Sequence, residues 1–100
     1  MSIDPTLNGK NLVAATMANV TASSSGTPTF QLARVRAGTP ADMLSTKLTV
    51  DAGEYHSSTA ATAAVIDTAN DDVATGDFIR FDCDVAGTDT KGIIITLTFA

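Results

Sequence analysis

Only one histidine and one cysteine are present in the chain, and neither has the neighbours that catalysis or metal binding needs. A lone His56 cannot complete a catalytic triad or a histidine-rich metal site, so we expect a solvated or locally hydrogen-bonded side chain. Cys83 alternates with Phe81 and Val85, which predicts a small apolar filler on the inward face of a strand, not an activated thiolate. A single cysteine also excludes an intrachain disulfide.

Four acidic residues, Asp67, Asp71, Asp72 and Asp77, gather in and beside one predicted loop. Oxygen clusters of this kind can hold calcium. Their spacing departs from the EF-hand pattern, in which ligands recur at every second position. Aspartate is also a frequent turn former. The sequence therefore favours an acidic turn and leaves calcium binding as the alternative.

One pair of carboxylates, Asp82 and Asp84 beside Arg80, resembles the acid and base of a polysaccharide-cleaving enzyme. Residues two apart on a strand share a face, where acids are ordinarily solvated or ion-paired across strands. The sequence contains no glycine-rich phosphate loop and no cofactor fingerprint. We therefore predict that the protein is not an enzyme and has no catalytic, cofactor-binding or metal site.

The elements that must position these residues are predicted to be strands. Alanine and threonine each occur 16 times, and β-branched residues favour a pleated surface over a helix. Apolar and polar residues alternate over 78–85 and 93–99, and the glycine-bounded loop between them predicts an antiparallel hairpin. Further strands are predicted at 12–21, 29–36, 46–51 and 65–66, with loops at 23–28 and 37–40 and an irregular crossover over 57–70.

The predicted fold is a small antiparallel β-sandwich, all-β and jelly-roll-like, because short strands recur at turn intervals of about ten residues. Within 12–21, the alternation places Leu12, Ala14, Thr16, Ala18 and Val20 on one face. We expect a single domain over 12–100, preceded by an N-terminal arm over 1–11.

The composition bounds the size and partners of the protein. One hundred residues at 10.2 kDa allow one domain, and only five aromatic residues give it a lean core, which favours self-association. A net charge of −5 disfavours nucleic acid. The first ten residues lack the apolar core of a signal peptide, and no apolar run approaches the roughly 20 residues of a membrane helix, so no membrane partner is expected.

Three blocks of the sequence carry a resemblance to a known family: 42–54 (DMLSTKLTVDAGE), 64–77 (AVIDTANDDVATGD) and 79–99 (IRFDCDVAGTDTKGIIITLTF). They resemble a β-rich module of tailed-bacteriophage virion proteins, found as a capsid decoration (cement) or head-fibre protein and as a domain of tail fibres. The resemblance spans roughly 26–99. It implies a jelly-roll-like sandwich, often trimeric, without catalysis, and it offers no motif residue to transfer as a site.

Two functions follow as expectations. The first is a capsid decoration protein, made in the host cytoplasm without a signal peptide, that binds the outer surface of the major capsid protein lattice and stabilises the head. The second is a tail-fibre or tail-tip head domain that binds a host receptor.

Two sets of residues are candidates for contacts in a decoration protein. Ile3, Pro5 and Leu7 would anchor the N-terminal arm to the capsid by edge-strand addition, and a frayed terminus is the alternative. In a homotrimer, Arg34 and Arg36 would face carboxylates of a neighbouring subunit.

Overall fold

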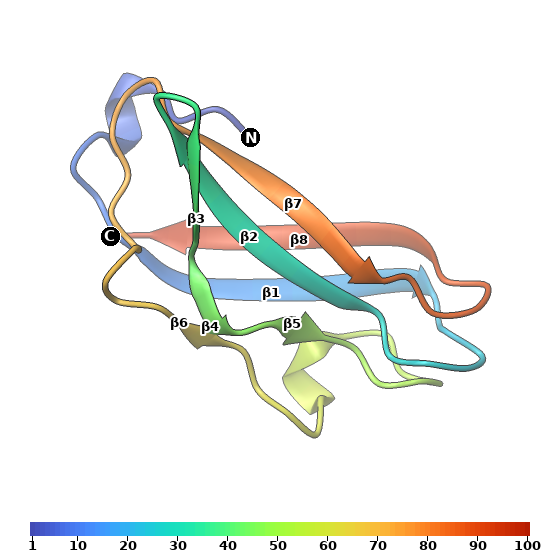
Figure 1. The fold of residues 1–100 in the computed structure, drawn as a ribbon. Helices are drawn as coiled ribbons and strands as arrows, with labels where there is room; N and C mark the ends of the chain where they lie inside the picture. The colour runs from blue at the N-terminus through green and yellow to red at the C-terminus, as the bar shows by residue number, and fades with distance from the viewer.

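The computed structural model describes residues 1–100 and shows an all-β chain with antiparallel sheets (Figure 1). This confirms the predicted fold class. The only helices are two short 3-10 turns, and neither has the length or the apolar character needed to span a bilayer. The elements are the helices η1 (Pro5–Leu7) and η2 (Ser57–Thr59) and the strands β1 (Leu12–Thr21), β2 (Thr29–Arg36), β3 (Thr39–Asp42), β4 (Leu44–Thr46), β5 (Leu48–Thr49), β6 (Val65–Ile66), β7 (Phe78–Val85) and β8 (Lys91–Phe99).

The long strands pair in a nested order, first with last and second with last but one. β1 pairs with β8, and β2 pairs with β7. In Figure 1 the β2–β7 ribbon crosses in front of the β1–β8 ribbon, so the two form the layers of a sandwich. Strands β3 and β5 extend the sheet of β2, and β4 pairs with β6. Because these four strands are short, the jelly-roll-like arrangement stays a prediction.

The predicted hairpin between residues 78–85 and 93–99 is wrong. Both segments are strands, but β7 pairs with β2 and β8 with β1. The intervening loop crosses from one sheet to the other, and it is bonded to the loop between β1 and β2, where Thr88 N–H donates to Ser25 O at 2.9 Å and Ser24 N–H to Thr88 O at 2.9 Å. Alternation defines a strand and its faces, but it does not identify the neighbouring strand.

The inward face of β1 also differs from the prediction. The strand has the predicted bounds, but its register against β8 shifts between Leu12 and Ala14, which leaves Val13 as an extra residue. A bulge of this kind turns every following side chain to the opposite face. The buried positions are therefore Leu12, Met17 and Asn19, whereas Val20 points outward.

The predicted loop at 37–40 contains a strand instead. β2 and β3 form a tight hairpin in which Arg36 pairs with Thr39 and the two turn residues have positive φ, +50° at Ala37 and +79° at Gly38. Positive φ at both positions matches the right-handed twist of the strands. Pro40 is tolerated because β3 lies at a sheet edge.

The middle of the chain largely follows its prediction. β6 has the predicted bounds, and the rest of the crossover over 57–70 is irregular apart from η2. Of the predicted strand 46–51, Thr46 ends β4 and Leu48–Thr49 form β5, while residues 50 and 51 lie outside any strand. β4 and β5 pair with different partners.

The core lies between the two layers and is small, as expected from the few aromatic residues. Only 17 of 100 residues are buried, and Met17, Leu32 and Ile79 contribute from β1, β2 and β7. The four apolar residues of β8 that point inward are only partly buried, so β8 covers the core without being fully covered itself. The buried cluster consists of Ile3, Leu12, Met17, Leu32, Met43, Leu44, Leu48, Val50, Val73 and Ile79.

Candidate functional site

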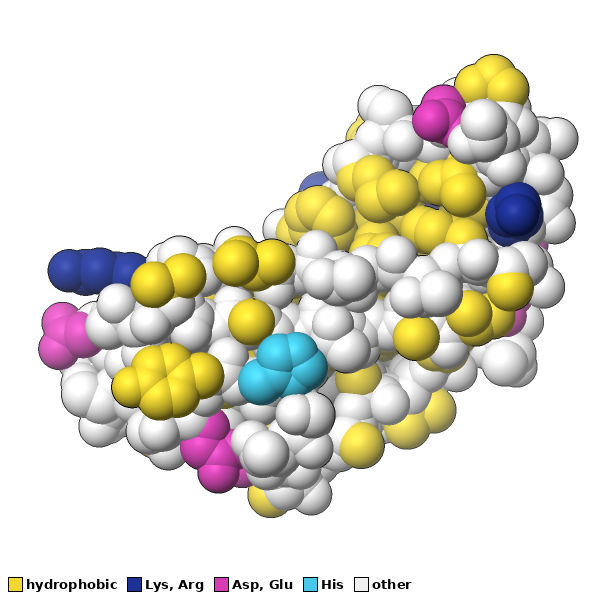
Figure 2. Space-filling model, turned by 180° about the vertical axis from the view of Figure 1, so that it is seen from behind, with side chains coloured by type: hydrophobic (Ala, Val, Ile, Leu, Met, Phe, Trp, Pro, Cys, Tyr) yellow, Lys and Arg dark blue, Asp and Glu magenta, His cyan; other side chains and the backbone are white.

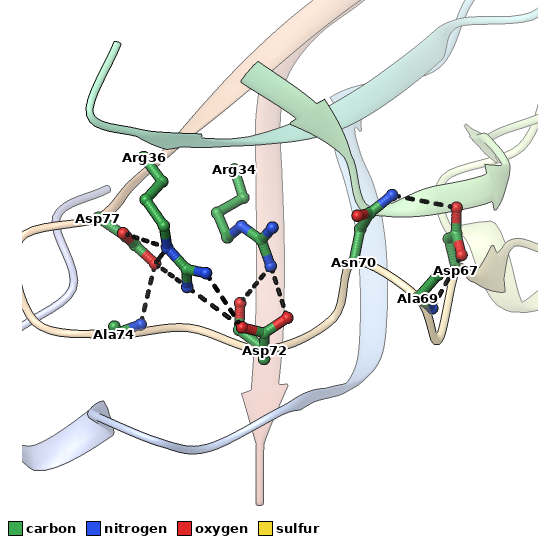
Figure 3. A network of polar contacts seen from close by, with 8 residues as sticks. All are labelled: Arg34, Arg36, Asp67, Ala69, Asn70, Asp72, Ala74 and Asp77. Atoms are coloured by element: carbon green, nitrogen blue, oxygen red, sulfur yellow. Dashed lines mark hydrogen bonds and ion pairs between the residues drawn. The ribbon is translucent and has the colours of Figure 1, made fainter. Parts of the chain in front are cut away.

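The strongest cluster of charges joins the end of β2 to the segment before β7 (Figure 3). Arg36 donates to Asp77 with Nε at 3.0 Å from Oδ1 and Nη2 at 2.7 Å from Oδ2, and it also reaches Asp72 at 3.2 Å. Arg34 donates through Nη1 to the carboxylate and to the backbone carbonyl of Asp72, both at 2.7 Å. We call these four residues the arginine network.

The network sets the protonation of its two acids. Hydrogen bonds from Arg36 hold the pKa of Asp77 below its ordinary value, against a smaller opposing effect of burial, and the backbone N–H of Ala74 adds to the lowering. At Asp72, partial burial raises the pKa, but the bonds from Arg36 and Arg34 together outweigh it and leave the pKa lowered. The hydrogen bonds that Arg36 donates to Asp77 are also the main reason that the pKa of Arg36 is raised.

Through these contacts the arginine network links β2 to the segment 71–77. The side chain of Asp77 is only 4% exposed. Arg34 and Arg36, expected to face a neighbouring subunit, are instead paired with carboxylates of their own chain. A role in a subunit interface stays a prediction.

Replacing Asp77 with asparagine is expected to lower the free energy of unfolding at pH 7 by about 2 kcal/mol, because charge-assisted bonds to a buried acceptor are weakened. An acid whose pKa is lowered by folding stabilises the fold above its ordinary pKa of 3.8 and loses that effect as the pH falls through the lowered value. The difference between the wild type and Asp77→Asn should therefore shrink below about pH 4. Urea unfolding at pH 7 and pH 3 measures it.

The matched control is Asp71→Asn, because the Asp71 side chain takes no part in the ion pairs. It should change the stability by no more than about 0.5 kcal/mol at either pH. A loss for Asp77→Asn that is the same at pH 7 and pH 3 would contradict the role assigned to its charge.

Within the acidic segment only Asp72 and Asp77 come together, and they do so around Arg36. Asp67 caps its own turn by accepting from Ala69 N–H at 3.0 Å, while Asp72 and Asp77 face arginines. No three His, Cys, Asp or Glu side chains are grouped so that they could hold a metal ion.

The remaining acids on β7 are ion-paired. Arg80 contacts Asp82 at 2.6 Å along the same strand, and Lys47 contacts Asp84 at 2.7 Å across the sheet. The two carboxylates singled out as a possible acid–base pair therefore each face a cation. The structure has no ligand-sized pocket.

The lone histidine has a local structural role. His56 precedes η2, and its Nδ1 accepts from the backbone N–H of Ser58 at 3.0 Å, which fixes the neutral ring as the Nε2–H tautomer in this contact. This confirms the predicted locally hydrogen-bonded side chain.

The lone cysteine is not where the alternation placed it. Cys83 is exposed, so the prediction of a buried filler is wrong. Phe81, two residues before it on the same face of β7, is also exposed.

The first residues do not project as an arm. Ile3 belongs to the core, and its N–H donates to Asp77 O at 2.9 Å. Leu7 packs partly buried against the same core, and Pro5 is exposed in η1. Residues 1–11 are therefore packed as part of the domain, which corrects the expected division at residue 12.

The β1–β8 ribbon presents a sheet face that carries no charge, which we call the outer face. Its apolar members Val13, Val20 and Ile94 are 52%, 68% and 55% exposed. Cross-strand pairs such as Thr16 with Thr96 fill the space between them. In a chain with 17% charged residues, such depletion is typical of the centre of a protein interface. The outer face consists of Val13, Ala14, Thr16, Ala18, Val20, Gly92, Ile94, Thr96 and Thr98.

A second apolar surface lies where the sandwich is open, between β7 and β8. Seen from behind, hydrophobic side chains gather there in a hollow (Figure 2). β7 contributes Phe81, and β8 contributes the inward residues that are only partly buried. We call this surface the open side.

The protein is therefore all-β, with two exposed apolar surfaces, the outer face and the open side. Neither a protein-family model, nor a curated protein, nor a solved structure matches the chain.

Proposed function

We propose that the protein is a bacteriophage capsid decoration protein that binds the outer surface of the major capsid protein lattice and stabilises the head. The observation that carries the proposal is the uncharged outer face of β1 and β8. The resemblance of three sequence blocks to phage virion modules supplies the kind of partner.

The outer face suits a lattice contact for physical reasons. A two-stranded ribbon without charged side chains can be buried against another protein without leaving unpaired charges, which are costly to desolvate. Exposed Val and Ile side chains contribute roughly 25 cal/mol for each Å² removed from water. Many copies on one particle add their contacts to the stability of the head.

In this proposal the protein is made in the host cytoplasm and ends on the capsid surface, with the major capsid protein and copies of itself as partners. The resemblance implies a homotrimer. The net charge of −5 suits the solubility of the free protein before assembly.

One observation favours the alternative of a tail-fibre head domain. Tyr55 is strongly exposed next to His56, and an exposed aromatic ring beside a polar group can stack on a receptor sugar.

The test is binding to capsids of the encoding phage that lack the protein. Val13→Lys/Val20→Lys places two charges on the outer face and should weaken co-sedimentation at least about tenfold, equivalent to about 1.4 kcal/mol. Tyr55→Ala is the matched control and should bind like the wild type. Circular dichroism should show that both variants are folded.

Immunogold labelling of virions separates the two functions. Gold on heads, together with loss of binding by the charged variant, is the expected result. Gold confined to tails, or full capsid binding by the charged variant, would overturn the proposal.

A further inference from the structure

The last strand has one edge without a partner. β8 pairs only with β1, although it extends over nine residues. An unpaired edge presents a row of backbone donors and acceptors that can pair with another chain.

The hydrogen bonds of β1 show which groups of β8 face that edge. In an antiparallel pair, directly opposed residues alternately bond to each other and point away from each other. Three residues of β1 donate their backbone N–H to acceptors that lie away from β8: Leu12 to Asp71 O, Met17 to Ser57 Oγ and Asn19 to Tyr55 O. The β8 residues opposite them are Phe99, Ile95 and Ile93, respectively. The backbone groups of these β8 residues therefore point away from β1, toward the free edge.

The alternation extends this assignment along the strand. Backbone groups of Lys91, Ile93, Ile95, Leu97 and Phe99 face the edge. Four of these five residues are also the inward-pointing apolar side chains that one chain leaves partly exposed.

The edge of β8 lacks the features that usually prevent pairing. Natural edges are protected by charges, proline, bulges or a covering segment. Between Gly92 and Phe99 there is no charged residue and no proline. The neighbouring edge of β7, in contrast, is covered at Phe78 and Ile79 by the first two residues and carries Arg80 and Asp82 beyond them.

We propose that β8 pairs antiparallel with β8 of a second copy, about a two-fold axis at Ile95. This register opposes Ile95 to itself, Ile93 to Leu97 and Lys91 to Phe99. All edge-facing backbone groups from Lys91 to Phe99 then find partners. The two ribbons become one four-stranded sheet, β1–β8–β8–β1.

The strand is self-complementary, and this favours a second copy over a foreign peptide. Inward apolar residues meet inward apolar residues, and Ile94 meets Thr96 on the outer face. The only charges are the two Lys91 side chains, which lie at opposite ends of the paired strands, about 27 Å apart at ~3.4 Å per residue. That exceeds the Debye length of about 10 Å at 0.1 M salt.

The pairing goes beyond the proposed function and holds whether or not the chain binds a capsid. It joins two outer faces into one wider uncharged surface. It also predicts a dimer, where the family resemblance implies a trimer.

Two matched double variants test the register. Ile94 and Thr96 are exposed, and their partners on β1 are uncharged, so charges there are tolerated within one chain. Ile94→Lys/Thr96→Lys opposes like charges twice across the axis, whereas Ile94→Lys/Thr96→Glu opposes unlike charges. Light scattering should give twice the chain mass of 10.2 kDa for the wild type and the second variant, and the mass of one chain for the first.

Hydrogen exchange gives a second readout on the wild type. Amides of Ile93, Ile95 and Leu97 should gain protection as the concentration rises, whereas those of Ile94 and Thr96, bonded to β1, should be protected throughout. A mass of one chain at 100 micromolar, a mass of three chains, or a dimer that persists in a folded like-charge variant would each overturn the proposal.

Discussion

Replacing Gly87 with alanine is expected to lower the free energy of unfolding by about 2–5 kcal/mol, through left-handed strain of about 1–2 and overpacking of about 1–3. Gly87 has φ +73°, and a Cβ there would lie 2.6 Å from Ser23 Oγ, 2.8 Å from Thr90 Oγ1 and 3.1 Å from Pro28 Cγ. Ser23 cannot yield easily, since it is buried and donates to Gly26 O at 2.9 Å. Urea unfolding followed by circular dichroism measures the loss.

Gly53→Ala separates the two contributions. Gly53 has φ +80°, but a Cβ there meets nothing within 4 Å. Only the backbone strain of about 1–2 kcal/mol is expected. Equal losses of unfolding free energy at both glycines would show that the β7–β8 loop does not pack tightly against the β1–β2 loop.

The second large effect is expected at Ile79. This side chain is 2% exposed and belongs to the core, so Ile79→Ala should cost about 3 kcal/mol through lost burial and the cavity left behind. Phe81 has the larger side chain and lies two residues further along the same face of β7, but it is 40% exposed. Phe81→Ala should cost only about 1 kcal/mol in the isolated chain.

The comparison of Ile79 with Phe81 locates the border between the core and the open side. Thermal unfolding of both variants, fitted together with urea data, provides the two values. If Phe81→Ala proved as costly as Ile79→Ala, the open side would be closed in solution.

Much of the strand content could be predicted because alternation is local. The bounds predicted for β1, β2, β6 and β7 are those observed, since each of these strands has a run of residues suited to a pleated surface. The strand partners could not be predicted, because β7 has an apolar face that would fit β8 as well as β2. The inward face of β1 was predicted wrongly from Val13 onward. One extra residue there exchanges the inward and outward positions of the strand, and the composition gives no sign of it.

The candidate surfaces were missed for a different reason. Residues 11–33 and 92–100 contain no charged side chain, and this signal was available in the sequence. The two uncharged segments form one surface only because β1 and β8 pair side by side. The arginine network likewise depends on tertiary structure, because Arg34 and Asp72 are 38 residues apart and meet only through the packing of 71–77 on β2.

The nested pairing of strands also governs when the protein can fold. Leu12 finds its partner Phe99 only after 87 further residues (99 − 12 = 87) have been made. β1 therefore cannot pair with β8 until β8 has left the ribosome. Contacts this distant in sequence are typical of chains that fold in milliseconds to seconds. Until then the uncharged strand β1 lacks its partner, and such exposed strands favour misassembly between neighbouring nascent chains.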